Sequence, residues 1–214
     1  MPPPRPAPPV DPYAITPRPE DADDDVVYYR ERAIALKSGV RGELVRTNFV
    51  RLRRGRLYLR SGMAAAEAKV LDTRLDEAFA KNDDAAVLDL SAQLLADDQA
   101  AIRVHRMRGM ALRRMGRVAE ADFHRDVARV LIESIVGVGD GRTFDSAWVV
   151  FRGKEEAEVL KALGCATESQ NLSLRGGRKF DVLLTRKADS GEARELYFDV
   201  TELHAEALRT PGRN

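Results

Sequence analysis

Two turn signals divide a long helical stretch of this chain into units of equal length. Between residues 64 and 135, apolar side chains recur every three or four positions, the spacing of one face of an α-helix. Asn82 and Gly116 interrupt this pattern, 34 residues apart, and Asp83 is placed to cap the helix that follows the first turn. The stretch therefore predicts four helices in two hairpins. Their expected core positions are Leu71, Leu75, Ala78, Phe79, Ala86, Val87, Leu90, Leu94, Ala100, Val104, Met107, Ala111, Met115, Ala121, Ala128, Leu131 and Ile132.

The 34-residue spacing is the period of tetratricopeptide repeats. Alignment on that period puts Gly109 at the small-residue position of a first helix, where two helices approach closely. Ala121 and Ala128 fall on the small positions of the second helix, whereas the first unit carries Leu75, Val87 and Leu94 at such positions. The region thus resembles a pair of tetratricopeptide-like helical hairpins.

An arginine-rich segment, residues 103–117, lies on the third of these helices. Arg103, Arg106, Arg113, Arg114 and Arg117 lie on the arc opposite the apolar one, which predicts a solvated face. Arg108 alone sits within the apolar arc, where we expect it to need a carboxylate partner. The chain has 35 basic and 34 acidic residues, and no aromatic residues interleave with these arginines. This balance predicts no nucleic-acid binding.

The two ends of the chain are expected to lie outside the folded core. Nine of the ten prolines precede residue 20, so residues 1–25 are predicted to form an extended tail. Asp25 is expected to cap a helix that starts at Val26 and ends near Gly39. Residues 43–60 fit either a helix or a strand, and helix is favoured. Residues 205–214 are assigned to a C-terminal tail.

The composition changes after the helical region, residues 26–136. Residues 137–204 predict a small α+β unit. It has a strand in SAWVVF, a helix with Ala157, Leu160 and Leu163 inward, and three strands joined by RGG and ADSGE turns. The fold class is therefore α+β, with tetratricopeptide-like hairpins packed against a small C-terminal antiparallel β-sheet unit. The helices are expected to cover the sheet, because a three-stranded meander is not stable alone.

An ordered set of motifs from about residue 47 to residue 200 resembles a bacterial family known as domain of unknown function 4919. These motifs are NFVRLRRGRLY, ADFHRDVARVLIESI, GDGRTFDSAWVVF, EVLKALG, SQNLSLRGGRKFDVL and LYFDV. The resemblance implies helical-repeat character before a small β region, and it implies no activity. Many members look exported, so the compartment stays open: cytoplasmic as the chain stands, periplasmic or exported if a signal peptide was removed. No apolar run is long enough to span a bilayer.

No catalytic residue, metal site or cofactor is predicted. His105 and His124, with Asp122 or Asp126, could hold a metal, but capping or surface histidines are the favoured reading. The residues that could bind a ligand are Arg108, His124, Gln170, Asp181 and Asp199. The last three could instead be the outward half of a strand alternation, in which Phe180, Val182 and Leu184 face the other way.

The architecture favours a non-enzymatic interaction module that binds a peptide or protein partner through its helical hairpins. The alternative is a small-ligand-binding or enzymatic domain that uses the polar face of the β unit. The even charge balance and the absence of a long apolar run predict neither a nucleic-acid partner nor a membrane span.

Overall fold

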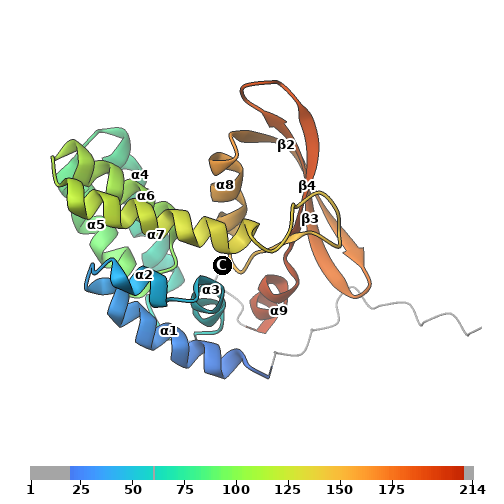
Figure 1. Ribbon diagram of the computed structural model, residues 1–214, viewed down its shortest axis with the longest axis horizontal. Helices are drawn as coiled ribbons and strands as arrows, with labels where there is room; N and C mark the ends of the chain where they lie inside the picture. The colour runs from blue at the N-terminus through green and yellow to red at the C-terminus, as the bar shows by residue number, and fades with distance from the viewer. Residues whose placement is uncertain (1–19, 60, 210–214) are drawn as a thin grey trace, which may run out of the picture.

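The computed structural model describes residues 20–59 and 61–209, and this part of the chain has an α+β fold (Figure 1). Nine helices and a four-stranded sheet lie within these ranges. In chain order the elements are α1 (Ala22–Lys37), α2 (Gly42–Arg46), α3 (Phe49–Tyr58), α4 (Ala65–Ala80), α5 (Asp84–Asp97), α6 (Ile102–Arg114), α7 (Val118–Val136), β1 (Trp148–Val149), α8 (Gly153–Ala162), β2 (Cys165–Arg175), β3 (Arg178–Lys187), β4 (Ala193–Asp199) and α9 (Thr201–Arg209).

The first helix begins earlier than the sequence pattern suggested. It starts at Ala22 rather than Val26, and the expected cap Asp25 lies inside its first turn, 3% exposed. The Asp25 carboxylate accepts hydrogen bonds from Arg51 Nε at 2.6 Å and Arg54 Nη1 at 3.4 Å, both from α3. Only residues 1–19 of the predicted tail lie outside the described residues. The local pattern missed this earlier start because the arginines that hold the first turn come from another helix, α3.

Helix is the correct reading of the segment predicted at residues 43–60, because its described part contains most of α2 and the whole of α3. The Asn48 side chain caps α3 by accepting hydrogen bonds from the Val50 and Arg51 amides. Gly55 allows α3 to cross α1 closely. A methyl group at this position would overlap the Asp25 carbonyl and lie 2.8 Å from Tyr29 Cβ.

The next four helices form the two predicted hairpins, α4–α5 and α6–α7. Both turns are left-handed, with φ of 54° at Asn82 and 75° at Gly116, and Asp83 caps α5 through the Ala86 amide. Gly109 lies where α6 meets α7, since a Cβ there would be 3.2 Å from the Ala121 carbonyl oxygen. The hairpins are therefore confirmed, while their likeness to tetratricopeptide repeats stays a prediction.

The sheet has the strand order β1-β4-β3-β2. The meander β2-β3-β4 is antiparallel, as predicted, and its hairpins turn at the RGG and ADSGE segments. β1 pairs with β4 in parallel, so the sheet is mixed rather than wholly antiparallel. A parallel pair needs a long connection between its strands, and α8, β2 and β3 provide it between β1 and β4.

Side chains of β3 alternate between two faces, and Asp181 lies on the inward face. Asp181 pairs with Phe198, and Leu183 pairs with Leu196, so these residues share the face that joins the main core. Phe180 lies on the opposite face, where Phe144 of the 137–147 loop covers it at a ring-centroid distance of 5.1 Å. The expectation that Asp181 faces outward is therefore wrong, because a loop, not the helices, covers the Phe180 face.

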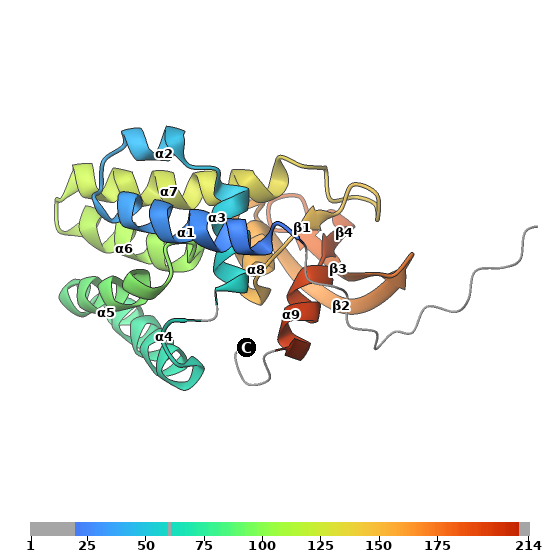
Figure 2. The same cartoon turned by 90° about the horizontal axis from the view of Figure 1, so that it is seen from below.

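α8 lies between the hairpins and the sheet, as both views show (Figures 1 and 2). Leu160 is buried as predicted, but Ala157 is exposed, and three glutamates of α8 are buried instead: Glu155, Glu156 and Glu158. Arg53 of α3 donates to Glu155 at 3.2 Å, and Arg106 of α6 donates to Glu158 at 2.9 Å. Glu155 and Glu158 are tolerated here because guanidinium groups from two other helices reach them.

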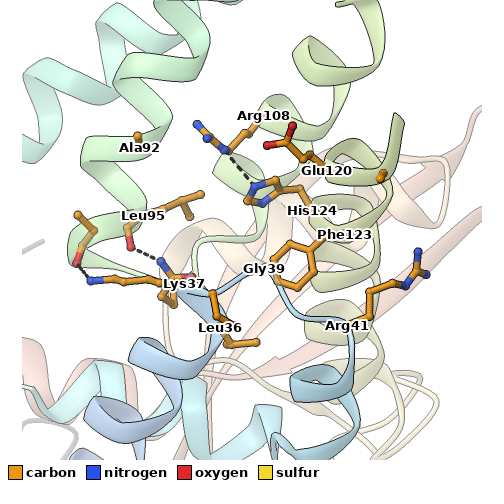
Figure 3. A pocket seen from close by; sticks show the side chains of 14 residues that line it. Leu36, Lys37, Gly39, Arg41, Ala92, Leu95, Arg108, Glu120, Phe123 and His124 are labelled. Carbon is orange, nitrogen blue, oxygen red and sulfur yellow. Dashed lines mark hydrogen bonds between the residues drawn. The ribbon is translucent and has the colours of Figure 1, made fainter. Parts of the chain in front are cut away.

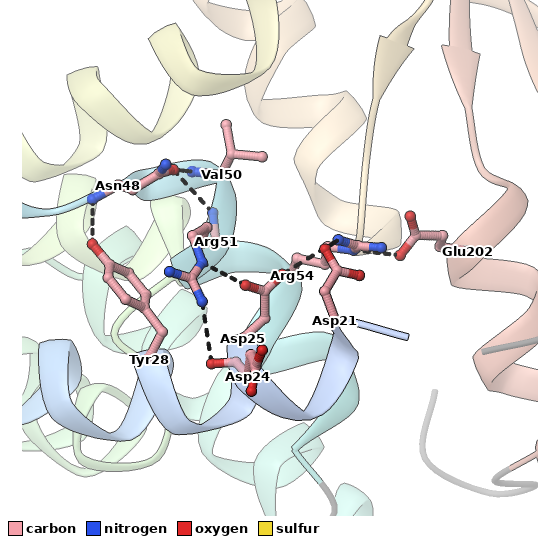
Figure 4. A network of polar contacts seen from close by, with 9 residues as sticks. All are labelled: Asp21, Asp24, Asp25, Tyr28, Asn48, Val50, Arg51, Arg54 and Glu202. Carbon is pink, nitrogen blue, oxygen red and sulfur yellow. Dashed lines mark hydrogen bonds and ion pairs between the residues drawn. The ribbon is translucent and has the colours of Figure 1, made fainter. Parts of the chain in front are cut away.

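A polar network joins both ends of the described chain (Figure 4). Arg54 of α3 donates to Asp21 before α1 at 2.7 Å and to Glu202 of α9 at 2.9 Å. α9 extends to Arg209 and buries Ala205, although residues 205–214 were assigned to a tail. This helix is ordered by contacts with α3 and β3, which a local sequence pattern does not contain.

Candidate functional site

A pocket of about 580 Å³ lies where α1 and the turn after it face α5, α6 and α7 (Figure 3). Its walls carry many small residues, which leave the space open: Ser38, Gly39, Ala92, Ala96 and Ala119. Leu36, Leu95 and Phe123 provide an apolar lining. The pocket therefore joins segments about eighty residues apart in sequence.

The lining of this pocket is positively charged. Three cations, Lys37, Arg41 and Arg108, line it together with one carboxylate, that of Glu120, which gives a formal lining charge of +2. Arg41 is paired with Asp126, and Glu120 is paired with Arg117. Within residues 20–59 and 61–209, neither Lys37 nor Arg108 has a carboxylate partner. The pocket thus holds excess positive charge in a chain whose overall charge is only +1.

Arg108 is held by neutral groups. Its Nε donates to His124 Nε2 at 3.0 Å, and its Nη1 donates to the Leu88 carbonyl at 2.7 Å and to Ser91 Oγ at 3.0 Å. The sequence pattern correctly placed Arg108 away from the other arginines, but the expected carboxylate partner is absent among the described residues. Burial, and next the nearby charge of Arg117, lower the pKa of Arg108.

His124 and His105 extend this chain of hydrogen bonds from Arg108 into the protein interior. The Nδ1 atoms of the two rings are 2.9 Å apart, and His105 Nε2 lies 3.1 Å from the Gln99 carbonyl oxygen. His105 is completely buried and His124 is partly buried, so neither is the surface or capping histidine that was expected. Burial is the main cause that lowers the pKa of His105 to about 3 and that of His124 to about 4.

A metal site at this histidine pair lacks its carboxylates. Asp122 is paired with Arg113 and Arg125, and Asp126 with Arg41 and Arg125. In the part of the chain that the structure describes, no group of three or more histidine, cysteine, aspartate or glutamate side chains could hold a metal ion. The two rings therefore bind each other and Arg108.

The five remaining arginines of residues 103–117 are each bound by a carboxylate. Arg103 pairs with Asp72 and Asp76, Arg106 with Glu158, Arg113 with Asp122, Arg114 with Asp84, and Arg117 with Glu120. The side chain of Arg103 is only 17% exposed, whereas that of Arg113 is 54% exposed. The prediction of a simply solvated face was therefore incomplete, because α4, α5, α7 and α8 provide acids on both sides of α6.

The candidates in the β unit divide between two places. Gln170 Nε2 donates to Asp181 Oδ2 at 2.8 Å, and the buried Glu156 carboxyl of α8 faces the same aspartate. Burial and the nearby charge of Asp181 raise the pKa of Glu156 well above its usual range. Asp199 lies on the other face, where it accepts from Arg178 Nε at 3.1 Å and from the Thr201 amide at 2.9 Å. The structure does not combine these three residues into one site.

Sequence reasoning found one wall of the pocket and missed the other. Arg108 and His124 were candidates, and the structure brings them together. Lys37, Gly39 and Arg41 were not candidates, although Gly39 was read as a helix stop. Its φ of 70° turns the chain after α1. No local pattern shows which distant helix such a turn will face.

None of the described helices is long and apolar enough to cross a membrane.

Comparison with known proteins gives one match. No curated protein and no solved structure matches the chain. The family described as "Domain of unknown function (DUF4919)" matches residues 60–209, which include both hairpins, the sheet and α9. The chain therefore belongs to the DUF4919 family.

Proposed function

We propose that this protein is a non-enzymatic interaction module that binds a peptide segment of a partner protein in the pocket between α1, α5, α6 and α7. The observation that carries the proposal is the pocket itself: about 580 Å³ of open space with small residues on its walls and a lining charge of +2. This volume is in the range of sites that enclose ligands, roughly 300–1,000 Å³. It suits a few side chains of a peptide.

The polar groups of the pocket support binding rather than catalysis. The Ser38 hydroxyl donates to the Ala35 carbonyl at 2.7 Å, and His124 Nε2 accepts from Arg108. A nucleophilic serine would need a free basic partner within hydrogen-bonding distance. These groups instead hold the walls in place.

A selection from a random-peptide display library on the immobilised full chain tests the proposal. Peptides that it yields should bind the chain in fluorescence polarisation. Ala92→Trp should weaken that binding at least about tenfold, a loss of about 1.4 kcal/mol, because the indole fills the pocket. Ala157→Trp is the matched control, since Ala157 is an exposed helical alanine of α8 outside the pocket lining. Failure to select any peptide, or equal loss in both variants, would refute the proposal.

A small-ligand or enzymatic role for the β unit is the alternative. The contact of Gln170 and Glu156 with Asp181 favours it, because a buried carboxyl with a raised pKa, such as that of Glu156, can serve as a general acid. Asp199 does not contribute to this cluster, because it lies on the opposite face of the sheet. Retention of peptide binding by Asp181→Asn would separate the two roles.

A further inference from the structure

We infer that Arg108 forms a carboxylate-binding site in the wall of this pocket. The inference names the ligand group of the proposed peptide, and so it rests on the proposed function for its biological ligand. The carboxylate would come from an acidic side chain or from a C-terminus. The inference is carried by a contrast among the six arginines between residues 103 and 117. Five have carboxylate partners, and within the described residues Arg108 has none.

The hydrogen bonds of Arg108 leave one nitrogen available. A guanidinium has five N–H donors. Nε uses its donor on His124, and Nη1 has two acceptors, Leu88 O and Ser91 Oγ. Nη2 makes no hydrogen bond to any residue of the described ranges, and it is not among their fully buried unpaired atoms. Two donors therefore remain on a side chain that lines an open pocket.

The position of this guanidinium is fixed before any ligand arrives. Three acceptors from two helices hold two of its nitrogens: Leu88 O and Ser91 Oγ of α5, and His124 Nε2 of α7. A donor that is already oriented loses little side-chain freedom when an anion binds. Charge-assisted hydrogen bonds of guanidinium to carboxylate are also among the stronger ones in proteins.

The surrounding charges favour an anion. Lys37 is a second lining cation, and it donates to the Ala96 carbonyl at 3.0 Å rather than to an acid. Glu120 also lines the pocket, but it is paired with Arg117, and the lining keeps a net charge of +2. An unmodified peptide carries its negative charges on carboxylates, so we assign the site to a carboxylate.

The test is an NMR titration of the full chain with sodium acetate, at constant ionic strength maintained with sodium chloride. The Arg108 Nε–H and His124 ring resonances should shift saturably, while Arg103 Nε–H, which is held by two aspartates, should not. Acetate should bind at least as tightly as inorganic phosphate. Arg108→Lys keeps the charge but loses the fixed fork, and acetate affinity should fall at least about tenfold in that variant, about 1.4 kcal/mol.

The outcomes separate this inference from the proposed function. An unsaturable shift, an equal effect of chloride, or tighter binding of phosphate would overturn the carboxylate site even if selected peptides bind. A saturable acetate shift at Arg108 supports the site even if no peptide is selected. For selected peptides, amidation of the C-terminus and replacement of acidic side chains by amides identify which carboxylate Arg108 receives.

Discussion

His105 and His124 meet through like atoms, with their Nδ1 nitrogens 2.9 Å apart. Arginine can only donate, so His124 Nε2 must accept from Arg108 and carry no proton. A neutral His124 then has its proton on Nδ1 and donates it to His105. His105 in turn is protonated at Nε2, because the Gln99 carbonyl can only accept. The donor–acceptor chemistry thus assigns one neutral tautomer to each ring, Nδ1–H for His124 and Nε2–H for His105.

The first prediction concerns these tautomers. In ¹⁵N-resolved NMR spectra near neutral pH, His124 should show the Nδ1–H form and His105 the Nε2–H form. The chain has only three histidines, so the signals can be assigned by His204→Gln. The same tautomer for both rings, or a charged ring at neutral pH, would contradict the hydrogen-bond order.

The second prediction is a loss of stability in acid. The folded-state pKa values of His105 and His124 are lowered to about 3 and about 4, from an unfolded value of 6.5. The unfolded chain therefore binds more protons below 6.5, and the stability from the neutral rings is present above that pH and lost as pH falls. By pH 4 the fully buried His105 alone should lower the free energy of unfolding by about 3 kcal/mol relative to neutral pH.

Urea unfolding measured between about pH 7 and pH 4 checks this expectation, since its midpoint and slope give the free energy. His105→Leu should be less stable than the parent at neutral pH and should lose less stability on acidification. His204→Gln is the control for replacing a histidine. An unchanged acid dependence in His105→Leu would contradict the assignment.

The third prediction concerns the glycine at the crossing of α1 and α3. Gly55→Ala should destabilise the fold by about 1–3 kcal/mol, because the new methyl group overlaps the Asp25 carbonyl. Gly153→Ala is the matched control, since nothing lies within 4 Å of a Cβ at that helical position. The control should be neutral or slightly stabilising. Equal melting temperatures for the two variants would show that α1 and α3 do not cross as described.

The fourth prediction separates Asp25 from its neighbour. Asp25→Asn should destabilise the protein by about 1–3 kcal/mol, because it weakens buried bonds to Arg51 and Arg54. Asp24→Asn should have little effect, since Arg51 contacts the Asp24 carbonyl rather than its side chain. A chain that begins at Val26 should likewise melt below one that begins at Glu20. If these pairs melt alike, the first turn of α1 does not contribute to the fold.

The fifth prediction is that the arginines of α6 and the turn after it do not bind nucleic acid. Five of them are already neutralised by carboxylates, so they would release few counterions from a phosphate backbone. Fluorescence anisotropy with labelled single- and double-stranded oligonucleotides at physiological salt should detect no binding tighter than about 10⁻⁶ M. Sub-micromolar binding that is lost on charge reversal of Arg106 and Arg113 would show the opposite.

The β3 strand and α8 show how far a local pattern can be taken. The alternation of Phe180, Asp181 and Val182 was visible in the sequence, and so was the helical stripe that includes Leu160. Which face is inward was not visible, because loop 137–147 covers one face of the sheet and α8 lies against the other. Hydropathy assigned the polar residues to solvent, whereas Asp181 and three glutamates of α8 point into the protein.

The sequence by itself determined helices α4 to α8, the two helical hairpins and the meander, because caps, turns and apolar periods act between residues only a few positions apart. It also determined the family, through an ordered set of motifs. Only the tertiary structure decided the charge partners and the pocket. Arg53 and Glu155 are 102 residues apart, and Lys37 and Arg108 line one pocket made by α1 and the helical hairpins. A buried charge is stable only where packing delivers its partner, and packing depends on how whole helices meet.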